Sequence, residues 1–267
     1  MCRPRDSHDL RLLGTGISIT PQPCDLRWMH DAFGNSIALA NFCESACQLV
    51  FESTFRAEHF PLPPQTIVID DYAAKLPFSY SASESVDLGS SKARHYADPL
   101  HQVDAWAKSL VENTAGYGTL DVLNHMNEGI KSQFTYRRRE EAGVQTPVET
   151  LQLGSGSCRD FAVFMIEAAR CLGLAAQFVS GYLYDESLID AKGGLVGGGA
   201  THAWVQIYLP GVGWVEFDPT NALVGGRNLI RVAVARAAEQ AAPLVGTYTG
   251  TTGDFLAMDV DVEVTAE

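Results

Sequence analysis

Two sequence features most constrain the fold of this chain of 267 residues. One is a helix start that carries a cysteine, and the other is a later hairpin that carries a histidine and an aspartate. Ser157 is a favourable N-cap for a helix over residues 158–172, which Gly173 ends. Gly154 and Gly156 let the backbone turn tightly directly before that helix. The sequence therefore predicts that Cys158 stands at the first helical position, exposed to the unpaired N–H groups of the helix end.

Residues 202–218 predict an antiparallel hairpin, with strands over His202–Leu209 and Trp214–Asp218. His202 lies on the strand face opposite the aliphatic one. The turn sets the register. A four-residue loop, 210–213, puts His202 and Asp218 on opposite faces, whereas a five-residue loop, 209–213, pairs Tyr208 with Trp214. Asp218 then lies one diagonal step from His202, within reach of an imidazole–carboxylate hydrogen bond.

Cys158, His202 and Asp218 together have the chemistry of a thiol nucleophile, its general base and the group that orients the base. A helix N-terminus stabilises a thiolate, and the backbone N–H of Cys158 is a candidate oxyanion donor. Each residue alone also has a structural interpretation. Cys158 could be a small turn residue, His202 a structural histidine, and Asp218 a turn former before a proline. The catalytic hypothesis predicts an odd loop or a bulge in the hairpin.

Two neighbouring features are less specific. Asp160 stands three residues after Ser157, which resembles a capping box and favours a structural role for this carboxylate over a catalytic one. The glycine-rich stretch 193–199 is either a mobile lid or an ordinary loop. It lacks the strand–loop–helix context of a phosphate-binding fingerprint.

The rest of the chain predicts a β-rich first portion and a mixed second portion, with a boundary near residues 80–97. Asp98 is a predicted N-cap with Pro99 at the first helical position, Thr119 opens the next helix, and Thr146 starts a short one. The predicted strands are Leu10–Ile19, Ile37–Phe42, Gln48–Phe55, Gln177–Tyr184, Leu229–Val234 and Phe255–Val264, with a hairpin turn at Asp31–Asn35. We expect domains over residues 1–85 and 95–267.

Composition limits the classes of partner. The net charge of −13 argues against nucleic acid and anionic membrane surfaces, and the short Arg137–Arg139 run reads as a solvated turn. No apolar stretch approaches the roughly 18 residues that a membrane helix needs, and no secretory signal is evident, so we expect a cytoplasmic location. The oligomeric state stays open.

The six cysteines are spaced irregularly for a disulfide framework, and we expect a reducing environment. Cys43 and Cys47 have no second ligand pair nearby, so we expect neither a zinc site nor any other metal or cofactor. Cys171 reads as a small buried hydrophobe late in its helix.

The motifs resemble those of the bacterial transglutaminase-like proteins, which belong to the papain-like cysteine enzymes. The similar stretches are Gly-Ser-Cys-Arg-Asp-Phe-Ala at 156–162, Ser180-Gly181-Tyr182, His202-Ala203-Trp204 and Asp218-Pro219-Thr220-Asn221, preceded by Ile130–Tyr136 and Glu149–Leu151. The resemblance implies an α+β fold, in which N-terminal helices and a nucleophile helix pack on an antiparallel sheet after a β-rich N-terminal domain. It places the family triad at Cys158, His202 and Asp218. No acidic cluster resembles the calcium sites of animal transglutaminases.

The resemblance implies an enzyme that transfers an acyl group from a peptide, protein or small amide carbonyl through a thioester. It leaves open whether water (cysteine protease or amidase) or an amine (transglutaminase) accepts the acyl group, and we favour water. Two alternatives stay open. One is an arylamine N-acetyltransferase-like enzyme, although that family opens with helices. The other is a catalytically silent peptide-binding module on the same fold.

Overall fold

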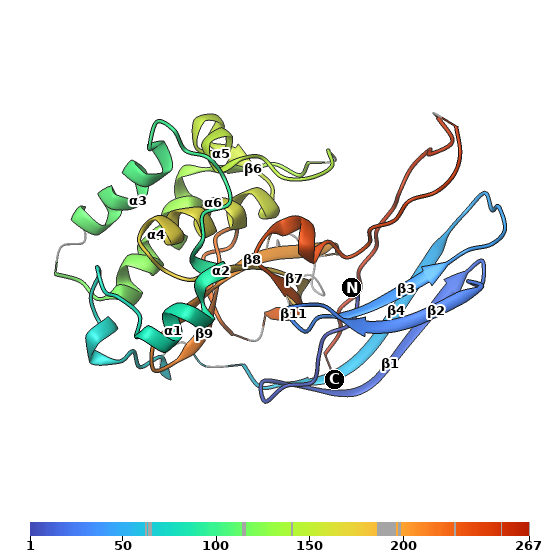
Figure 1. Ribbon diagram of the computed structural model, residues 1–267, viewed down its shortest axis with the longest axis horizontal. Coiled ribbons are helices and arrows are strands. Elements are labelled where there is room, and N and C mark those ends of the chain that lie inside the picture. Colours follow the sequence, from blue (N-terminus) through green and yellow to red (C-terminus); the bar gives the residue numbers. More distant parts are fainter. Residues whose placement is uncertain are drawn as a thin grey trace.

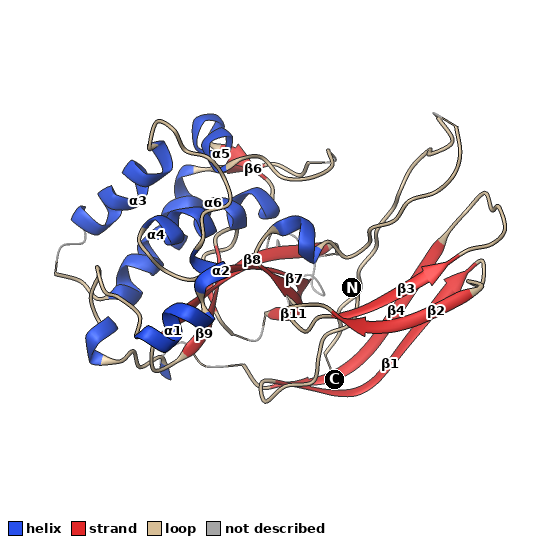
Figure 2. Ribbon diagram, in the orientation of Figure 1, coloured by secondary structure: helices blue, strands red, loops and turns tan. Residues whose placement is uncertain are grey.

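The computed structural model describes residues 1–61, 63, 66–113, 116–139, 141–185, 196, 199–226, 228–251 and 253–266. An α+β core follows four N-terminal strands that extend away from it (Figures 1 and 2). The expected fold class, a papain-like or transglutaminase-like core after a β-rich start, is therefore confirmed.

The N-terminal strands form two antiparallel pairs. β1 (Leu10–Thr20) pairs with β4 (Val50–His59), and β2 (Asp25–His30) pairs with β3 (Ser36–Asn41) across the predicted turn. That turn is closed by the Asp31 carboxylate, which accepts from the backbone N–H groups of Phe33 and Asn35. The sequence had not indicated β2.

The core sheet is antiparallel, in the order β10-β9-β8-β7-β11. Its strands are β7 (Ala176–Leu183), β8 (Thr201–Leu209), β9 (Gly213–Asp218), β10 (Leu223–Val224) and β11 (Leu229–Ala235). The helices are α1 (Ala82–Asp87), α2 (Gly89–Lys92), α3 (Gln102–Asn113), α4 (Thr119–Gln133), α5 (Pro147–Leu153) and α6 (Cys158–Cys171), with 3-10 turns at Asp71–Ala73 and Ala238–Ala241. A short parallel pair, β5 (Thr135–Tyr136) and β6 (Ser155–Gly156), precedes α6.

Helix α6 forms the centre of the core. Its buried Phe161, Phe164 and Met165 belong to the same cluster as the aliphatic residues of β8, which include Val205 and Ile207. This is the strand face that the alternation of residues 202–209 predicted to be apolar. The packing fixes α6 against the sheet, and it thereby fixes the position of the helix N-terminus.

The N-terminal strands are attached to the core through β11. The Asn35 side chain donates to the Val234 carbonyl (2.6 Å) and accepts from the Val234 N–H (2.9 Å), so that it pairs with the strand as a backbone would. Arg231 bridges Asp9 of the N-terminal portion (2.8 Å) and Glu216 of β9 (3.0 Å). The expected hairpin turn at 31–35 thus serves as a docking element.

Two expectations about secondary structure are wrong. Helix α3 begins at Gln102 rather than after Asp98, because His101 adopts a left-handed φ of 52°, and the Asp98 carboxylate instead accepts from the Gln102 and Val103 N–H groups (2.8 and 2.9 Å). The stretch 255–264 forms no strand, since no neighbouring strand offers it a ladder of partners. Within the described ranges, the Val262 N–H donates to the Gly199 carbonyl (3.3 Å).

The cysteine expectation is also wrong for one pair. Cys24 and Cys43 form a disulfide next to β2 and β3, closing a sequence separation of 19 residues. The spacing of the cysteines did not indicate this pair, because the two residues come together only through the register of the β2–β3 hairpin. The sequence predicted the turn and the second strand of that hairpin but not β2. Disulfides persist in oxidising environments, so this bond is at odds with the reducing surroundings that we expected. The cytoplasmic location stays a prediction.

Candidate active site

Cys158 occupies the first position of α6, as predicted. The side chain of Asp160 caps the helix by accepting from the Ser157 N–H and from the Ser157 hydroxyl, both at 2.8 Å. Cys158 itself is 8% exposed. The first N–H groups of a helix have no partner within it, so the thiol lies beside unpaired donors.

Asp160 has the structural role that its spacing favoured. Its other oxygen accepts from Arg139 Nη1 (2.8 Å) and from the Gln145 N–H (2.7 Å). Arg139 was expected in a solvated turn and is instead held by this carboxylate. Gly156 is required here, because a Cβ at that position would lie 2.8 Å from the Asp160 Cβ. The turn before Cys158 is therefore fixed by a buried carboxylate and a residue without a side chain.

The hairpin has the register that brings the histidine and the aspartate together. Tyr208 pairs with Trp214 and Leu209 with Gly213, which leaves only 210–212 as the loop. Asp218 therefore reaches His202 diagonally, and the distance from His202 Nε2 to Asp218 Oδ2 is 2.9 Å. Both side chains are fully buried. The structure thus brings these two predicted site residues into direct contact.

His202 is electrostatically unusual. Burial alone would lower its pKa, but the charge of Asp218 and the hydrogen bond to it, with smaller contributions from Cys158, raise the pKa of His202 to about 10. Its Nδ1 atom is buried and makes no hydrogen bond of normal geometry within the described part of the chain. The Cys158 thiol is nevertheless near enough to affect the imidazole. The histidine thus directs Nε2 at the Asp218 carboxylate. In the described part of the chain, its Nδ1 atom is not engaged in a hydrogen bond.

Asp218 is held from three directions. Besides His202, Oδ1 accepts from the Thr220 N–H (2.9 Å) and Oδ2 accepts from Asn221 Nδ2 (2.8 Å). Asn221 belongs to the motif at 218–221, but its place in the sequence indicated no role for it. The signal that could have found it is its spacing, three residues after the carboxylate on a tight turn.

Tyr136 is a second residue near the site for which the sequence pattern indicated no role. Strand pairing sets it opposite Gly156, two residues before the thiol. Burial raises the pKa of the Tyr136 phenol, and the neighbouring Cys158 raises it further. A half-buried phenol is therefore near enough to Cys158 to interact with it electrostatically.

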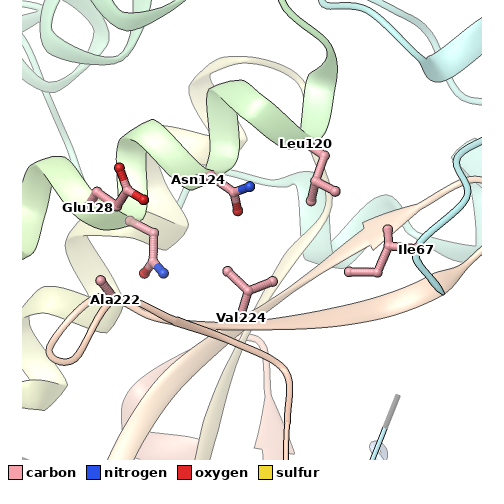
Figure 3. Close-up of a pocket in the computed structure, with 7 residues that line it drawn as sticks. Ile67, Leu120, Asn124, Glu128, Ala222 and Val224 are labelled. Carbon is pink, nitrogen blue, oxygen red and sulfur yellow. The ribbon is translucent and has the colours of Figure 1, made fainter. Parts of the chain in front are cut away.

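A cavity of about 200 Å³ lies elsewhere, between α4, β10 and the segment around Ile67 (Figure 3). Asn124, Asn127 and Glu128 are its polar lining residues on α4, and Ala222 and Val224 line its other side. It has no thiol or imidazole in its lining, so it does not compete with Cys158 for the role of reaction centre. Of the glycine-rich stretch 193–199, for which a lid and an ordinary loop were both left open, only Val196 and Gly199 belong to the described residues.

The residues that the structure describes contain no group of three or more metal-ligating His, Cys, Asp and Glu side chains. None of the helices in the described ranges is both long and apolar enough to cross a membrane.

Comparison with known proteins finds matches to transglutaminase-like families in both parts of the chain. Residues 104–219 match the model of the transglutaminase-like superfamily, and residues 1–58 match the bacterial transglutaminase-like N-terminal region. An uncharacterized protein of Mycobacterium tuberculosis is 29% identical over 97% of this chain and 84% of its own length. A protein-glutamine gamma-glutamyltransferase of Pseudomonas aeruginosa is 31% identical over 49% of this chain and 18% of its own length.

Among solved structures, a candidate cysteine protease from Cytophaga hutchinsonii superposes with a TM-score of 0.63. The match covers 91% of this chain and 76% of the other, at 16% sequence identity. At that identity the likeness shows the fold alone. The fold is one that supports thiol-dependent acyl transfer across its superfamily.

Proposed function

The chain belongs to the transglutaminase-like superfamily, with the N-terminal region of its bacterial members, and from that premise we propose that it cleaves amide bonds through a Cys158 thioester. The observation that carries the proposal is the buried His202–Asp218 contact of 2.9 Å, with the Cys158 thiol near enough to the imidazole to influence its pKa. We propose Cys158 as the nucleophile, His202 as the general base and acid, and Asp218 as the group that orients and stabilises the imidazolium.

The contacts of His202 define its protonation. Nε2 faces a carboxylate, which only accepts, so Nε2 carries a proton in both charge states. Nδ1 is then the nitrogen that takes the proton of the Cys158 thiol. A raised pKa of His202 favours the imidazolium that results. The resting pair therefore tends toward thiolate and imidazolium, which is the reactive form of a cysteine nucleophile.

The reaction follows in two halves. The thiolate attacks the carbonyl carbon, forming the C–S bond, and the C–N bond breaks as the leaving amine takes the proton from Nδ1. The acyl group is then a thioester on Cys158, and the imidazole is neutral. Water gives a proton to Nδ1 and attacks the thioester, and the departing sulfur recovers its charge beside the imidazolium.

The oxyanion of each tetrahedral intermediate needs fixed donors. The backbone N–H of Cys158 is the first candidate, because it lies at the first position of α6 and has no intrahelical partner. Stabilisation by such a donor requires no rearrangement during the reaction, since the packing of α6 on the sheet already fixes it.

We propose water as the ordinary acyl acceptor. The specific observation that favours an amine instead is the similarity to the P. aeruginosa protein named as a protein-glutamine gamma-glutamyltransferase. The arylamine N-acetyltransferase alternative is weaker, because residues 1–58 match the bacterial transglutaminase-like N-terminal region rather than an opening set of helices. The expected substrates are peptides, proteins or small amides, not nucleic acids or membranes.

Iodoacetamide labelling at neutral pH tests the proposal without knowledge of the substrate. Peptide mass spectrometry should find Cys158 alkylated fast and Cys171 alkylated slowly, because burial and Asp104 raise the pKa of the Cys171 thiol to about 11. A Cys47→Ser background removes an exposed competing thiol. In this background, Cys158→Ala should abolish fast labelling and Cys171→Ala should leave it intact. Slow labelling of Cys158, at the rate of Cys171, would refute the nucleophile assignment.

A second experiment separates the possible acceptors. The protein is incubated with a pool of peptide amides, with and without a primary amine, and the Cys158 peptide is examined by mass after acid quench. An acyl adduct on Cys158 supports the thioester, and the free acid or the amine conjugate identifies the acceptor. Absence of any adduct with every peptide and with acetyl-coenzyme A would favour the catalytically silent module.

A further inference from the structure

The side-chain amide of Asn221 is completely engaged and 5% exposed. Nδ2 donates to Asp218 Oδ2 (2.8 Å) and to the Val196 carbonyl (3.1 Å), and Oδ1 accepts from the Val196 N–H (2.9 Å). This arrangement fixes the orientation of the amide, because a flipped amide would set its oxygen against a carboxylate and a carbonyl.

The turn that carries Asn221 is fastened independently. Lys131 Nζ donates to the Asn221 carbonyl at 2.8 Å, and Asn127 Nδ2 donates to the Leu223 carbonyl at 2.9 Å, both from α4. The backbone turn at Asn221 is therefore held by α4, separately from the contacts that its side chain makes. That side chain joins the carboxylate of Asp218 to a backbone segment that precedes β8.

Asp218 Oδ2 has two partners, His202 Nε2 at 2.9 Å and Asn221 Nδ2 at 2.8 Å. The remaining contact in the described residues, from the Thr220 N–H, goes to the other oxygen, Oδ1 (2.9 Å), and therefore does not act on Oδ2 directly. A buried imidazolium depends steeply on the geometry of its counter-ion, because the surroundings have a low dielectric. The second contact on Oδ2 is thus what keeps that oxygen in line with Nε2.

We propose, resting on the function proposed above, that Asn221 is a positioning residue that holds Asp218 Oδ2 on His202, and that the Val196 backbone holds Asn221 in turn. The reactive thiolate–imidazolium pair at Cys158 then depends on a residue whose side-chain hydrogen bonds, among the described residues, go to Asp218 and Val196 and not to the thiol or the imidazole. The backbone at Val196 is 25 residues before Asn221 in sequence, so the proposal also links the segment ahead of β8 to the state of the reactive pair.

The test uses the full chain in the Cys47→Ser background and measures the rate of Cys158 alkylation by iodoacetamide from acidic pH to about pH 10. Asn221→Ala should slow alkylation at neutral pH about 10- to 100-fold. This is the loss typical of removing the outer hydrogen-bond partner of a metal-binding side chain, and we apply it by analogy to the partner of Asp218. The loss should vanish at the alkaline end, where a thiol ionises without help from an imidazolium. A merely structural role would lower the rate equally at every pH.

Asn127→Ala is the matched control, because Asn127 is also a buried asparagine that holds the same turn but does not touch Asp218. It should leave the pH profile of alkylation unchanged. Asn221→Ser provides a second variant should the alanine variant fail to fold, and its loss should lie between those of wild type and alanine. A folded Asn221 variant with the wild-type profile overturns the inference. Slow labelling of Cys158 in the wild-type chain overturns the proposed function instead.

Discussion

Replacement of Asp218 by Asn tests the source of the charge on His202. The pKa of His202 is raised from 6.5 to about 10, with the Asp218 charge as the largest favourable contribution against the burial penalty. A shift of that size corresponds to about 5 kcal/mol of preference for the protonated imidazole. Asp218→Asn removes the charge and keeps the shape, so the buried imidazole should become neutral at physiological pH.

The expected loss of activity follows from the same geometry. An asparagine amide can also present an N–H to Nε2, which would shift the ring proton to Nδ1 and remove the base that faces the thiol. In the analogous serine-enzyme triad this change costs about 10⁴-fold in turnover, and we expect a loss of about 10³- to 10⁴-fold in amide cleavage by Asp218→Asn. Enhanced alkylation of Cys158 at neutral pH should disappear with it.

The assay is the alkylation rate of Cys158 against pH, combined with chemical denaturation. A raised pKa contributes stability that is complete below the unfolded value of 6.5 and is lost as the pH rises through about 10. The stability advantage of wild type over Asp218→Asn should therefore shrink between neutral pH and about pH 11. A neutral-pH alkylation rate in Asp218→Asn equal to that of wild type would refute the reasoning, as would a pH-independent stability difference. Glu167→Gln, which removes a buried carboxylate without touching His202, is the control.

Three further changes test the scaffold. Glu167→Gln should lower the free energy of unfolding by about 3 to 5 kcal/mol, measured by urea denaturation, because it leaves Arg170 buried beside a neutral partner (2.8 Å at present). Gly181→Ala should lower the free energy of unfolding by about 1 to 3 kcal/mol in the same assay, since its Cβ would collide with the Ile230 carbonyl oxygen of β11. Reduction of Cys24–Cys43 should cost about 3 kcal/mol by the loop-entropy estimate for its separation of 19 residues, seen as a lower melting temperature with a reductant. Each expectation is contradicted if the variant has the same free energy of unfolding as wild type or, for the disulfide, if the reductant leaves the melting temperature unchanged.

Local patterns in the sequence predicted much of the core. The capping residue and the glycines before Cys158 placed the start of α6 correctly, because a helix N-terminus is specified by side chains within a few positions of it. The alternation along 202–209 correctly identified the apolar face of β8, since burial on one side of a strand imposes a period of two. Both signals depend on neighbours in sequence.

The features that the sequence missed depend on partners distant in sequence. The Cys24–Cys43 bond needs the register of β2 and β3, and β2 lacks a clear alternation because all of its residues are exposed. The helix after Asp98 begins late because His101 takes a left-handed conformation, which is uncommon for a residue other than glycine and which no local pattern indicated at this position. The bridge from Asn221 to Val196 spans 25 residues and leaves no periodic signal.

The turn of the β8–β9 hairpin depends both on local sequence pattern and on contacts with residues distant in sequence. Sequence alone narrowed the register to two choices, and a slip of one residue would have moved Asp218 to the other face of the sheet. The structure has the register with Leu209 opposite Gly213, and Gly211 in that turn has a φ of 88° and lies so close to Asp70 that a Cβ would approach the Asp70 carboxylate to 2.6 Å. The Asp70 N–H also donates to the Pro210 carbonyl (3.0 Å). A segment outside the hairpin therefore holds its turn, and through the register it sets the distance between the imidazole and the carboxylate.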